Sequence, residues 1–245
     1  MNKEDYTFFA EHGYLNLGKV LNDEEVAHFL DLFDRDQTEK RYCWFQHGNQ
    51  RINYDALMTT PAFDSAIRHP NILPIITELM GGPVCFSEIG ARYMGPYDGE
   101  PGRHWHRDRP HLPEHPLRME YIQVMLYLTD VDEDSHCFSL SPESIREPVI
   151  EDKEEQVRQK GIYDLHGPSG TAAVFNIAVQ HTATTRVTQR ERKTLQTYYG
   201  HRNHQYMSND SVIPACFWKH HEDPEVRAFY GVLNERTHLY MDALT

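Results

Sequence analysis

The stretch from 121 to 129 alternates with a period of two residues, and no other feature of the chain restricts the fold so strongly. The apolar residues of one face are Ile122, Val124, Leu126 and Leu128. The residues of the other face are Gln123, Met125 and Tyr127. A period of two is that of a β-strand. Residues 171–179 and 194–199, bounded by Gly170 and Gly200, also have the composition of strands.

Helices are predicted mainly before these strands. Asn22 and Glu25 have the spacing of a capping box. The apolar residues that follow at helical spacing are Val26, Phe29, Leu30 and Phe33. A second helix is predicted over 70–80, and a charged helix over 151–160. Helices first and short strands afterwards favour a β-sandwich or barrel with a helical flank.

No linker, repeat or low-complexity tract divides the 245 residues. We therefore expect a single domain over 1–245. Its helical N-terminal flank is expected at about 1–82, its β core at about 83–202 and a C-terminal extension at about 203–245.

Charge and cysteine content exclude several classes of protein. The chain has 24 Lys and Arg against 37 Asp and Glu, a net charge of −13, which disfavours binding to nucleic acid or anionic lipid. No apolar run approaches the roughly 18 residues of a membrane span, and the acidic start predicts no secretory signal. The four cysteines form no CxxC pair, as is typical of reduced thiols. We expect a cytoplasmic protein whose partner is a small molecule.

The densest chemistry lies at 103–111, where His106 and Asp108 are two residues apart. In an extended chain these side chains project to the same side and can converge on one ion. His181, which follows the strand at 171–179, is the candidate for a second imidazole. Two histidines and one carboxylate are the ligand set of iron(II) oxygenases that keep open coordination positions.

Arg192 follows His181 by eleven residues and opens the strand that carries Thr194, Gln196 and Tyr198 on one face. A guanidinium matches the two oxygens of a carboxylate in bidentate fashion. An enzyme that anchors the distal carboxylate of 2-oxoglutarate while the keto acid chelates iron needs such a group. Arg186 and Arg190 are nearby alternatives.

Four segments follow one another in an order shared with a known family. They are Phe8–Leu15, Trp105–Asp108, Leu128–Ser144, and His181 with Arg192. In these motifs the chain resembles the phytanoyl-CoA dioxygenase family of iron(II)/2-oxoglutarate oxygenases, which includes ectoine hydroxylase. The resemblance implies a double-stranded β-helix (jelly-roll, cupin-like) fold, with iron held by His106, Asp108 and His181. The chain departs from the family at Glu143 and Ile145, where Gly and His are usual.

The resemblance also implies the reaction. Iron(II), 2-oxoglutarate and O2 would be used to hydroxylate a small polar molecule, with release of succinate and CO2. Relatives that halogenate lack a carboxylate at the position of Asp108, so that chloride binds there. The carboxylate present here favours hydroxylation, or desaturation, over halogenation.

Two other functions compete for the same residues. His104, His106, Asp108 and His111 approximate the motif of metallo-β-lactamase-like zinc hydrolases, in which zinc activates water. That motif needs a histidine directly after the aspartate, where this chain has Arg109. The second alternative is a non-catalytic cupin-like binding module with structural histidines.

Further residues are expected near the site. Gln123 and Tyr93 are candidates for binding the cosubstrate, and His104, Arg109 and His111 for binding the substrate. Three arginines interrupt the acidic character of the chain, namely Arg103, Arg107 and Arg109. They suggest a substrate with an anionic group, although Arg107 should point away from the metal because HxD alternates.

Overall fold

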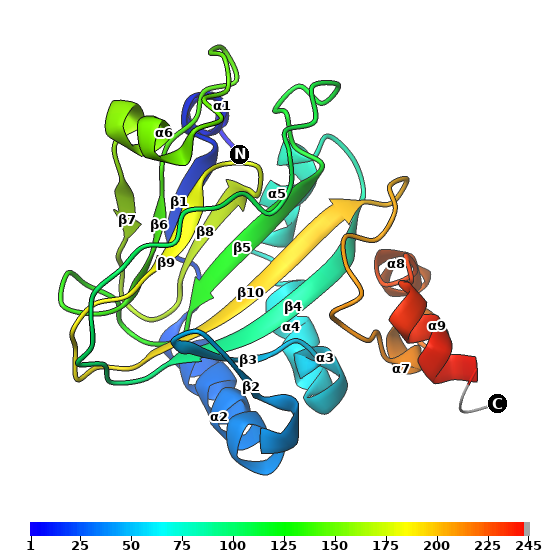
Figure 1. The fold of residues 1–245 in the computed structure, drawn as a ribbon. Helices are drawn as coiled ribbons and strands as arrows, with labels where there is room; N and C mark the ends of the chain where they lie inside the picture. Colours follow the sequence, from blue (N-terminus) through cyan, green and yellow to red (C-terminus); the bar gives the residue numbers. More distant parts are fainter. Residues whose placement is uncertain (243–245) are drawn as a thin grey trace.

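Two antiparallel β-sheets face each other in the structure, a computed structural model that describes residues 1–242 (Figure 1). The main sheet has seven strands, in the spatial order β1 (Tyr14–Lys19), β8 (Thr171–Asn176), β5 (Tyr121–Tyr127), β10 (Arg192–His201), β4 (Val84–Met94), β3 (Gln50–Asn53) and β2 (Phe45–His47). The minor sheet has three strands, in the order β7 (Tyr163–Leu165), β6 (Cys137–Leu140) and β9 (His181–Thr184). This is the expected double-stranded β-helix.

Helices cover the face of the main sheet that turns away from the minor sheet (Figure 1). They are α2 (Asp23–Glu39), α3 (Ala56–Thr59), α4 (Asp64–Ile67) and α5 (Leu73–Leu79), with the 3-10 turns η1 (Arg41–Cys43) and η2 (Pro61–Phe63). Outside this layer are α1 (Lys3–His12), α6 (Lys153–Lys160), α7 (Ala215–Trp218), α8 (Pro224–Phe229) and α9 (Glu235–Asp242). No helix within residues 1–242 combines the length and apolarity needed to cross a membrane.

The predicted capping box is present at the start of α2. The Asn22 side chain accepts from the Glu25 backbone N–H at 2.9 Å, and the Glu25 carboxylate accepts from the Asn22 N–H at 2.8 Å. Val26, Phe29 and Phe33 of this helix are buried in the core, as predicted. The other two predicted helices are confirmed as α5 and α6, each a few residues shorter than expected.

The alternation in β5 separates two hydrophobic cores. Its even-numbered apolar residues pack on the helical layer, whereas Met125 and Tyr127 pack between the sheets. Gln123 lies on the intersheet face and is 1% exposed. The predicted pattern is therefore confirmed, and it places a polar side chain inside the sandwich.

The N-terminal flank is less purely helical than the sequence suggests. Strand β1 pairs with β8, and β3 pairs with β4, so the segment 1–82 extends the main sheet at both edges. These strands are short, and β1 is interrupted at Gly18, which has a φ of +66°. Short edge strands are stabilised by pairing with longer neighbours, and they lack a long period of two that a sequence pattern would reveal.

The C-terminal segment fastens one loop to the sandwich. The Asn234 side-chain amide donates to the backbone oxygens of Ser208 and Ser211, at 3.1 and 2.8 Å. The α7–α9 helices lie together beside β4 (Figure 1), where the Tyr230 ring is 5.3 Å from that of Phe86. The loop that contains Ser208 is thereby held against the edge of the cavity described next.

Candidate active site

A cavity of about 690 Å³ lies between the sheets, and this size is typical of a small-molecule site. Its floor is formed by the intersheet faces of β4, β5 and β10, and β9 lies opposite. Two further segments close its mouth: residues 47–50 of the β2–β3 hairpin and residues 207–210 of the C-terminal loop. Segments from every region of the chain therefore meet at one site.

His106, Asp108 and His181 come together at this cavity. The His106 Nε2 lies 3.5 Å from Asp108 Oδ1, and the His181 Nε2 lies 3.5 Å from Asp108 Oδ2. One donor atom from each side chain lies within 4.8 Å of the others. These distances allow a single ion to bind all three donors, and the half-exposed His106 leaves the ion accessible from the cavity.

Backbone pairing explains this convergence. His106 and His181 form an isolated antiparallel bridge, and the Asp108 N–H donates to the Ile177 carbonyl at 3.1 Å. The segment 106–108 is therefore extended, and alternation turns Arg107 to the opposite side. There Arg107 donates to the carboxylate of Glu143 and to the Ala178 carbonyl. The Arg107 side chain thus points away from the metal triad, as predicted.

Hydrogen bonds orient each donor of the triad. The Nδ1 of His106 is 2.9 Å from the His104 carbonyl, and the Nδ1 of His181 is 2.9 Å from the Val179 carbonyl. A ring N–H that donates to a carbonyl leaves the Nε2 lone pair available for a metal. The Tyr198 hydroxyl donates to Asp108 Oδ2 at 3.0 Å and orients the carboxylate.

Electrostatics favour the metal-binding protonation state. Burial alone would raise the pKa of Asp108, but His181, His106 and the Tyr198 hydrogen bond lower it to about 2. Burial, reinforced by the neighbouring His181, lowers the pKa of His106. An ionised carboxylate and a neutral imidazole are the forms that bind metals.

Arg192 is buried without any charged partner. Its side chain is 1% exposed, and none of its three guanidinium nitrogens has a hydrogen-bond partner within residues 1–242. Burial lowers the pKa of this group. Arg192 itself does not line the cavity. Its partner on the neighbouring strand, Met94, does line the cavity. Guanidinium groups form strong bidentate hydrogen bonds with carboxylates, and the buried donors of Arg192 are free to do so.

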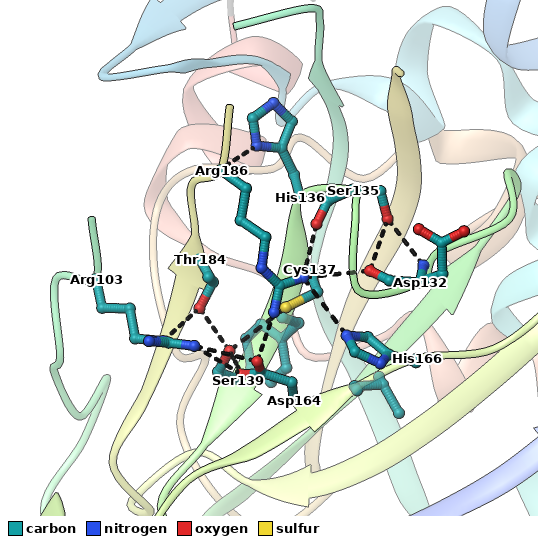
Figure 2. Close-up of polar contacts among 12 residues, drawn as sticks. Arg103, Asp132, Ser135, His136, Cys137, Ser139, Asp164, His166, Thr184 and Arg186 are labelled. Atoms are coloured by element: carbon teal, nitrogen blue, oxygen red, sulfur yellow. Dashed lines mark hydrogen bonds and ion pairs between the residues drawn. The ribbon is translucent and has the colours of Figure 1, made fainter. Parts of the chain in front are cut away.

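The two alternative arginines are already engaged. Figure 2 shows that Arg186 donates to the Asp164 carboxylate, at 2.5 Å, and to the carbonyls of Asp132 and Ser135. Arg190 forms an ion pair with Asp132. Of the three arginines considered for 2-oxoglutarate, only Arg192 lacks a partner within the described residues.

A second group of potential ligands lies on the minor sheet (Figure 2): Cys137 on β6, Asp164 on β7 and His166 just after β7. The Asp164 carboxylate there already accepts from Arg103 at 3.1 Å, from Arg186 and from the Ser139 hydroxyl. Two fixed guanidinium charges beside the carboxylate oppose the binding of a metal cation. This group is a polar network that joins the strands of the minor sheet.

Other predicted site residues divide into two sets. His104, Arg109 and Gln123 line the cavity, whereas Tyr93 and His111 do not. Tyr93 alternates with Arg92 and Met94, so it packs on the helical side of β4. The Nε2 of His111 lies 3.0 Å from the Glu143 carboxylate, on the side to which Arg107 also points. The expectations that Tyr93 binds the cosubstrate and that His111 binds the substrate therefore have no support in these positions.

The arginines at 103–109 do not form the expected anion site. Arg103 is paired with Asp164, and Arg107 with Glu143. Arg109 reaches the cavity wall but donates to the Met207 carbonyl and lies over the Tyr121 ring. The local excess of positive charge is thus largely neutralised by internal contacts.

Sequence reasoning missed several residues of the cavity wall: Tyr54, Glu88, Arg92, Ser208 and Asp210. Strand β4 contained a usable signal, because Glu88, Gly90 and Arg92 alternate with Ile89, Ala91 and Tyr93. Tyr54, Ser208 and Asp210 lie outside the predicted β core and reach the site through tertiary contacts alone.

Neither rival function gains support from this arrangement. The zinc-hydrolase motif needs His111 beside the metal, but this side chain is bound to Glu143. A purely structural role for the histidines does not explain why both Nε2 atoms face a carboxylate at the wall of a cavity.

Known structures share this fold. The α-ketoglutarate-dependent carbocyclase SnoK from nogalamycin biosynthesis is 20% identical, with a TM-score of 0.70 over 84% of this chain and 86% of SnoK. EctD from S. alaskensis, solved with 2-oxoglutarate and 5-hydroxyectoine, is 16% identical, with a TM-score of 0.71 over 84% and 78% of the chains. HygX from Streptomyces hygroscopicus, solved with nickel and 2-oxoglutarate, is 16% identical, with a TM-score of 0.68 over 84% and 89%.

No curated protein has a sequence that matches this chain significantly. The sequence profile of the family described as phytanoyl-CoA dioxygenase (PhyH) matches residues 9–194. This span contains His106, Asp108, His181 and Arg192 and covers most of the chain. The protein therefore belongs to the phytanoyl-CoA dioxygenase family.

Proposed function

We propose that this iron(II)/2-oxoglutarate-dependent dioxygenase holds its iron with His106, Asp108 and His181. The observation that carries the proposal is the convergence of the three donors within 4.8 Å at the wall of the cavity. Three protein ligands leave room around an octahedral ion for a chelating cosubstrate and O2. The hydrogen bonds to both Nδ1 atoms and from Tyr198 hold the donors in place before the metal binds.

Arg192 is proposed to bind the distal carboxylate of 2-oxoglutarate. Its unpaired guanidinium, buried in the main sheet, supports this role, because an anion would satisfy donors that otherwise have no partner. Arg192 lies on the same face of β10 as Gln196, which lines the cavity. The side-chain N–H of Gln123 donates to the side-chain oxygen of Gln196 at 3.5 Å. This pair is a candidate contact for the part of the cosubstrate between its two ends.

When bound, the iron and 2-oxoglutarate supply the oxidising chemistry, with release of succinate and CO2. The protein binds and orients the reactants. Asp108 fills the third ligand position as an ionised carboxylate, which favours hydroxylation over halogenation. The intersheet cavity places the reactants beside the triad.

The proposed substrate is a small polar molecule that enters beside His104 and Arg109. Both residues line the cavity, together with polar groups of the β2–β3 hairpin. We further propose that the chain acts as one domain, because strands from its N-terminal segment complete the main sheet. A reducing compartment such as the cytoplasm suits its cysteines, which are free in the described residues.

Measurement of iron-dependent turnover of 2-oxoglutarate tests the proposal. The purified protein should bind about one iron(II) per chain, and anaerobic addition of 2-oxoglutarate should produce the visible absorption band of an iron-chelated keto acid. Exposure to O2 should then release succinate. A protein that binds two zinc ions tightly and turns over no 2-oxoglutarate would refute the proposal in favour of a hydrolase.

A further inference from the structure

Glu88 faces the cavity because strand β4 contains a bulge. Tyr198 pairs with Glu88 and Tyr199 pairs with Phe86, so Ser87 has no partner in the ladder. In a regular strand Glu88 would share the face of Phe86, which packs on the helical layer. The extra residue turns the carboxylate to the opposite face, where it lines the cavity.

This position is adjacent to the metal triad. Glu88 lies opposite Tyr198 on the neighbouring strand, and the Tyr198 hydroxyl bonds to Asp108. Neighbouring strands are about 4.8 Å apart. Arg192 lies on the same face of the same strand as Tyr198, six residues toward its other end. A cosubstrate that extends from the metal toward Arg192 therefore leaves the Glu88 side for the substrate.

The Glu88 carboxylate is buried without an ion pair in the described residues. Its residue is 4% exposed, and its hydrogen bond comes from the neutral Ser208 hydroxyl, at 2.5 Å. No cation forms an ion pair with Glu88 within residues 1–242, and Arg92 acts on it only through the longer-range attraction of its charge. Burial raises the pKa of Glu88 to about 7 and repulsion by Asp210 contributes, although the Ser208 hydrogen bond and the charge of Arg92 act to lower it. A buried carboxylate that lacks an ion pair is destabilising, so its presence at a cavity wall points to a ligand.

The nearest cationic side chain on this strand, Arg92, makes its hydrogen bond to another residue. Arg92 donates to the Tyr54 hydroxyl at 3.2 Å and lies over the Tyr54 ring. Gly90 separates Arg92 from Glu88 on the cavity face, and a Cβ at Gly90 would come within 3.2 Å of the Arg92 Nε. The Arg92 side chain therefore lies over Gly90, and a ligand reaches Glu88 from the cavity that both charged residues line.

We propose that Glu88 binds a protonated amine of the substrate, so that the natural substrate is a small molecule with an ammonium group near the carbon that is oxidised. Asp210, on the loop that closes the cavity, adds a second negative charge, and Ser208 orients the Glu88 carboxylate. The inference rests on the proposed function, because it takes the metal triad as the reacting centre. It replaces the anionic substrate that the arginines at 103–109 suggest.

Three probes of equal length test this proposal: butylamine, 1-butanol and butyrate. Each is titrated anaerobically into the protein loaded with iron(II) and 2-oxoglutarate, while the absorption band of the chelated keto acid is recorded. The thermal midpoint is measured in parallel. Butylamine should perturb the band and raise the thermal midpoint at lower concentration than butanol, and butyrate should have the weakest effect.

Glu88→Gln removes the charge and keeps the shape of the side chain. It should raise the butylamine concentration needed for the same response by at least about tenfold, the usual contribution of a charge-assisted hydrogen bond. The band itself should remain, because iron and 2-oxoglutarate do not contact Glu88. Glu114→Gln, at an exposed position, is the matched control and should behave as the wild type.

The possible failures are distinguishable. If the band never forms in the wild type, the proposed iron and 2-oxoglutarate site is wrong. If the band forms but butanol or butyrate acts as strongly as butylamine, or Glu88→Gln responds to butylamine as the wild type does, only the ammonium assignment is overturned. The comparison of probes in the wild type does not depend on the stability of any variant.

Discussion

His106 and His181 exchange both backbone hydrogen bonds, with N···O distances of 3.1 and 3.0 Å, and their rings lie 4.4 Å apart between centroids. The two proposed iron ligands, 75 positions apart in the sequence, are therefore joined by the backbone itself. A metal site built on paired backbone segments is preorganised, since its geometry does not depend on the metal.

Removal of any member of the triad should abolish iron binding. His106→Ala, Asp108→Ala and His181→Ala should each lower iron(II) affinity by more than the roughly 10- to 100-fold that the loss of an outer hydrogen-bond partner costs. Metal content after equilibrium dialysis measures this effect. His104→Ala is the control, because His104 lines the same cavity outside the triad. Full iron content in all three variants would contradict the assignment.

Arg192→Ala should weaken 2-oxoglutarate binding about 100-fold or more, since two charge-assisted hydrogen bonds are lost at roughly 1.5–3 kcal/mol each. Iron content should remain normal. Arg192→Lys should recover part of the affinity, because an ammonium lacks the planar fork. Anaerobic titration of the visible band gives the dissociation constants. Arg190→Ala, which removes an exposed ion pair, serves as the control, and equal constants for Arg192→Ala and wild type would exclude the role.

Tyr198→Phe should lower iron affinity by about tenfold, because Asp108 loses the hydroxyl that orients it. Tyr199→Phe is a matched control on the opposite face of the same strand. It removes a hydrogen bond to the Ile67 carbonyl and should lower thermal stability without changing iron affinity. Parallel measurement of both quantities in both variants separates the two roles. The prediction fails if Tyr198→Phe changes only stability.

Glu88→Gln should stabilise the ligand-free protein at alkaline pH. The pKa of Glu88 is raised from 4.5 to about 7, so the folded state binds the proton more tightly than the unfolded state. The resulting stabilisation is complete below pH 4.5 and is lost as the pH rises through 7. At pH 8 the variant should be more stable than the wild type by up to about 3 kcal/mol, and at pH 5 the two should be nearly equal. Urea unfolding at both pH values measures the difference in the free energy of unfolding. A variant that is no more stable than the wild type at pH 8 would show that the ionised Glu88 carboxylate does not destabilise the fold.

Glu143→Ala should destabilise the segment that carries the metal ligands. The Glu143 carboxylate binds Arg107 and also accepts from the Gln180 N–H at 2.8 Å, so it connects residues adjacent to His106 and His181. Loss of the partner of a buried ion pair typically costs about 3–5 kcal/mol. Iron should also dissociate faster from the variant, as stopped-flow chelation would measure. Glu147→Ala, which removes an exposed ion pair with Lys160, should affect neither quantity.

The sequence predicted features that depend on local periodicity. The capping box of α2, the two faces of β5 and the shared side of His106 and Asp108 follow from spacing along a helix or a strand. Each of these rests on residues no more than a few positions apart, where chain geometry alone determines which side chains share a face.

Features that depend on distant contacts were not predictable in the same way. The bulge at Ser87 results from the way β4 and β10 pair, and the residue type at that position does not predict it. The alternation of Tyr93 with Arg92 was visible, but which face of β4 meets the cavity depends on the packing of the helical layer. The binding of His111 to Glu143 likewise required knowledge of where residue 143 lies.

The loop at 207–211, fastened by Asn234, lies beyond residue 194, where the match to the family profile ends. Ser208 and Asp210 of this loop face the substrate side of the cavity, whereas the proposed iron ligands all lie within the matched span. Part of the cavity wall on the substrate side is thus supplied from outside the span that holds the metal ligands, and it faces Glu88, which lies within that span. Exchange of this loop can therefore alter the substrate side of the cavity while the proposed iron ligands and their backbone pairing stay unchanged.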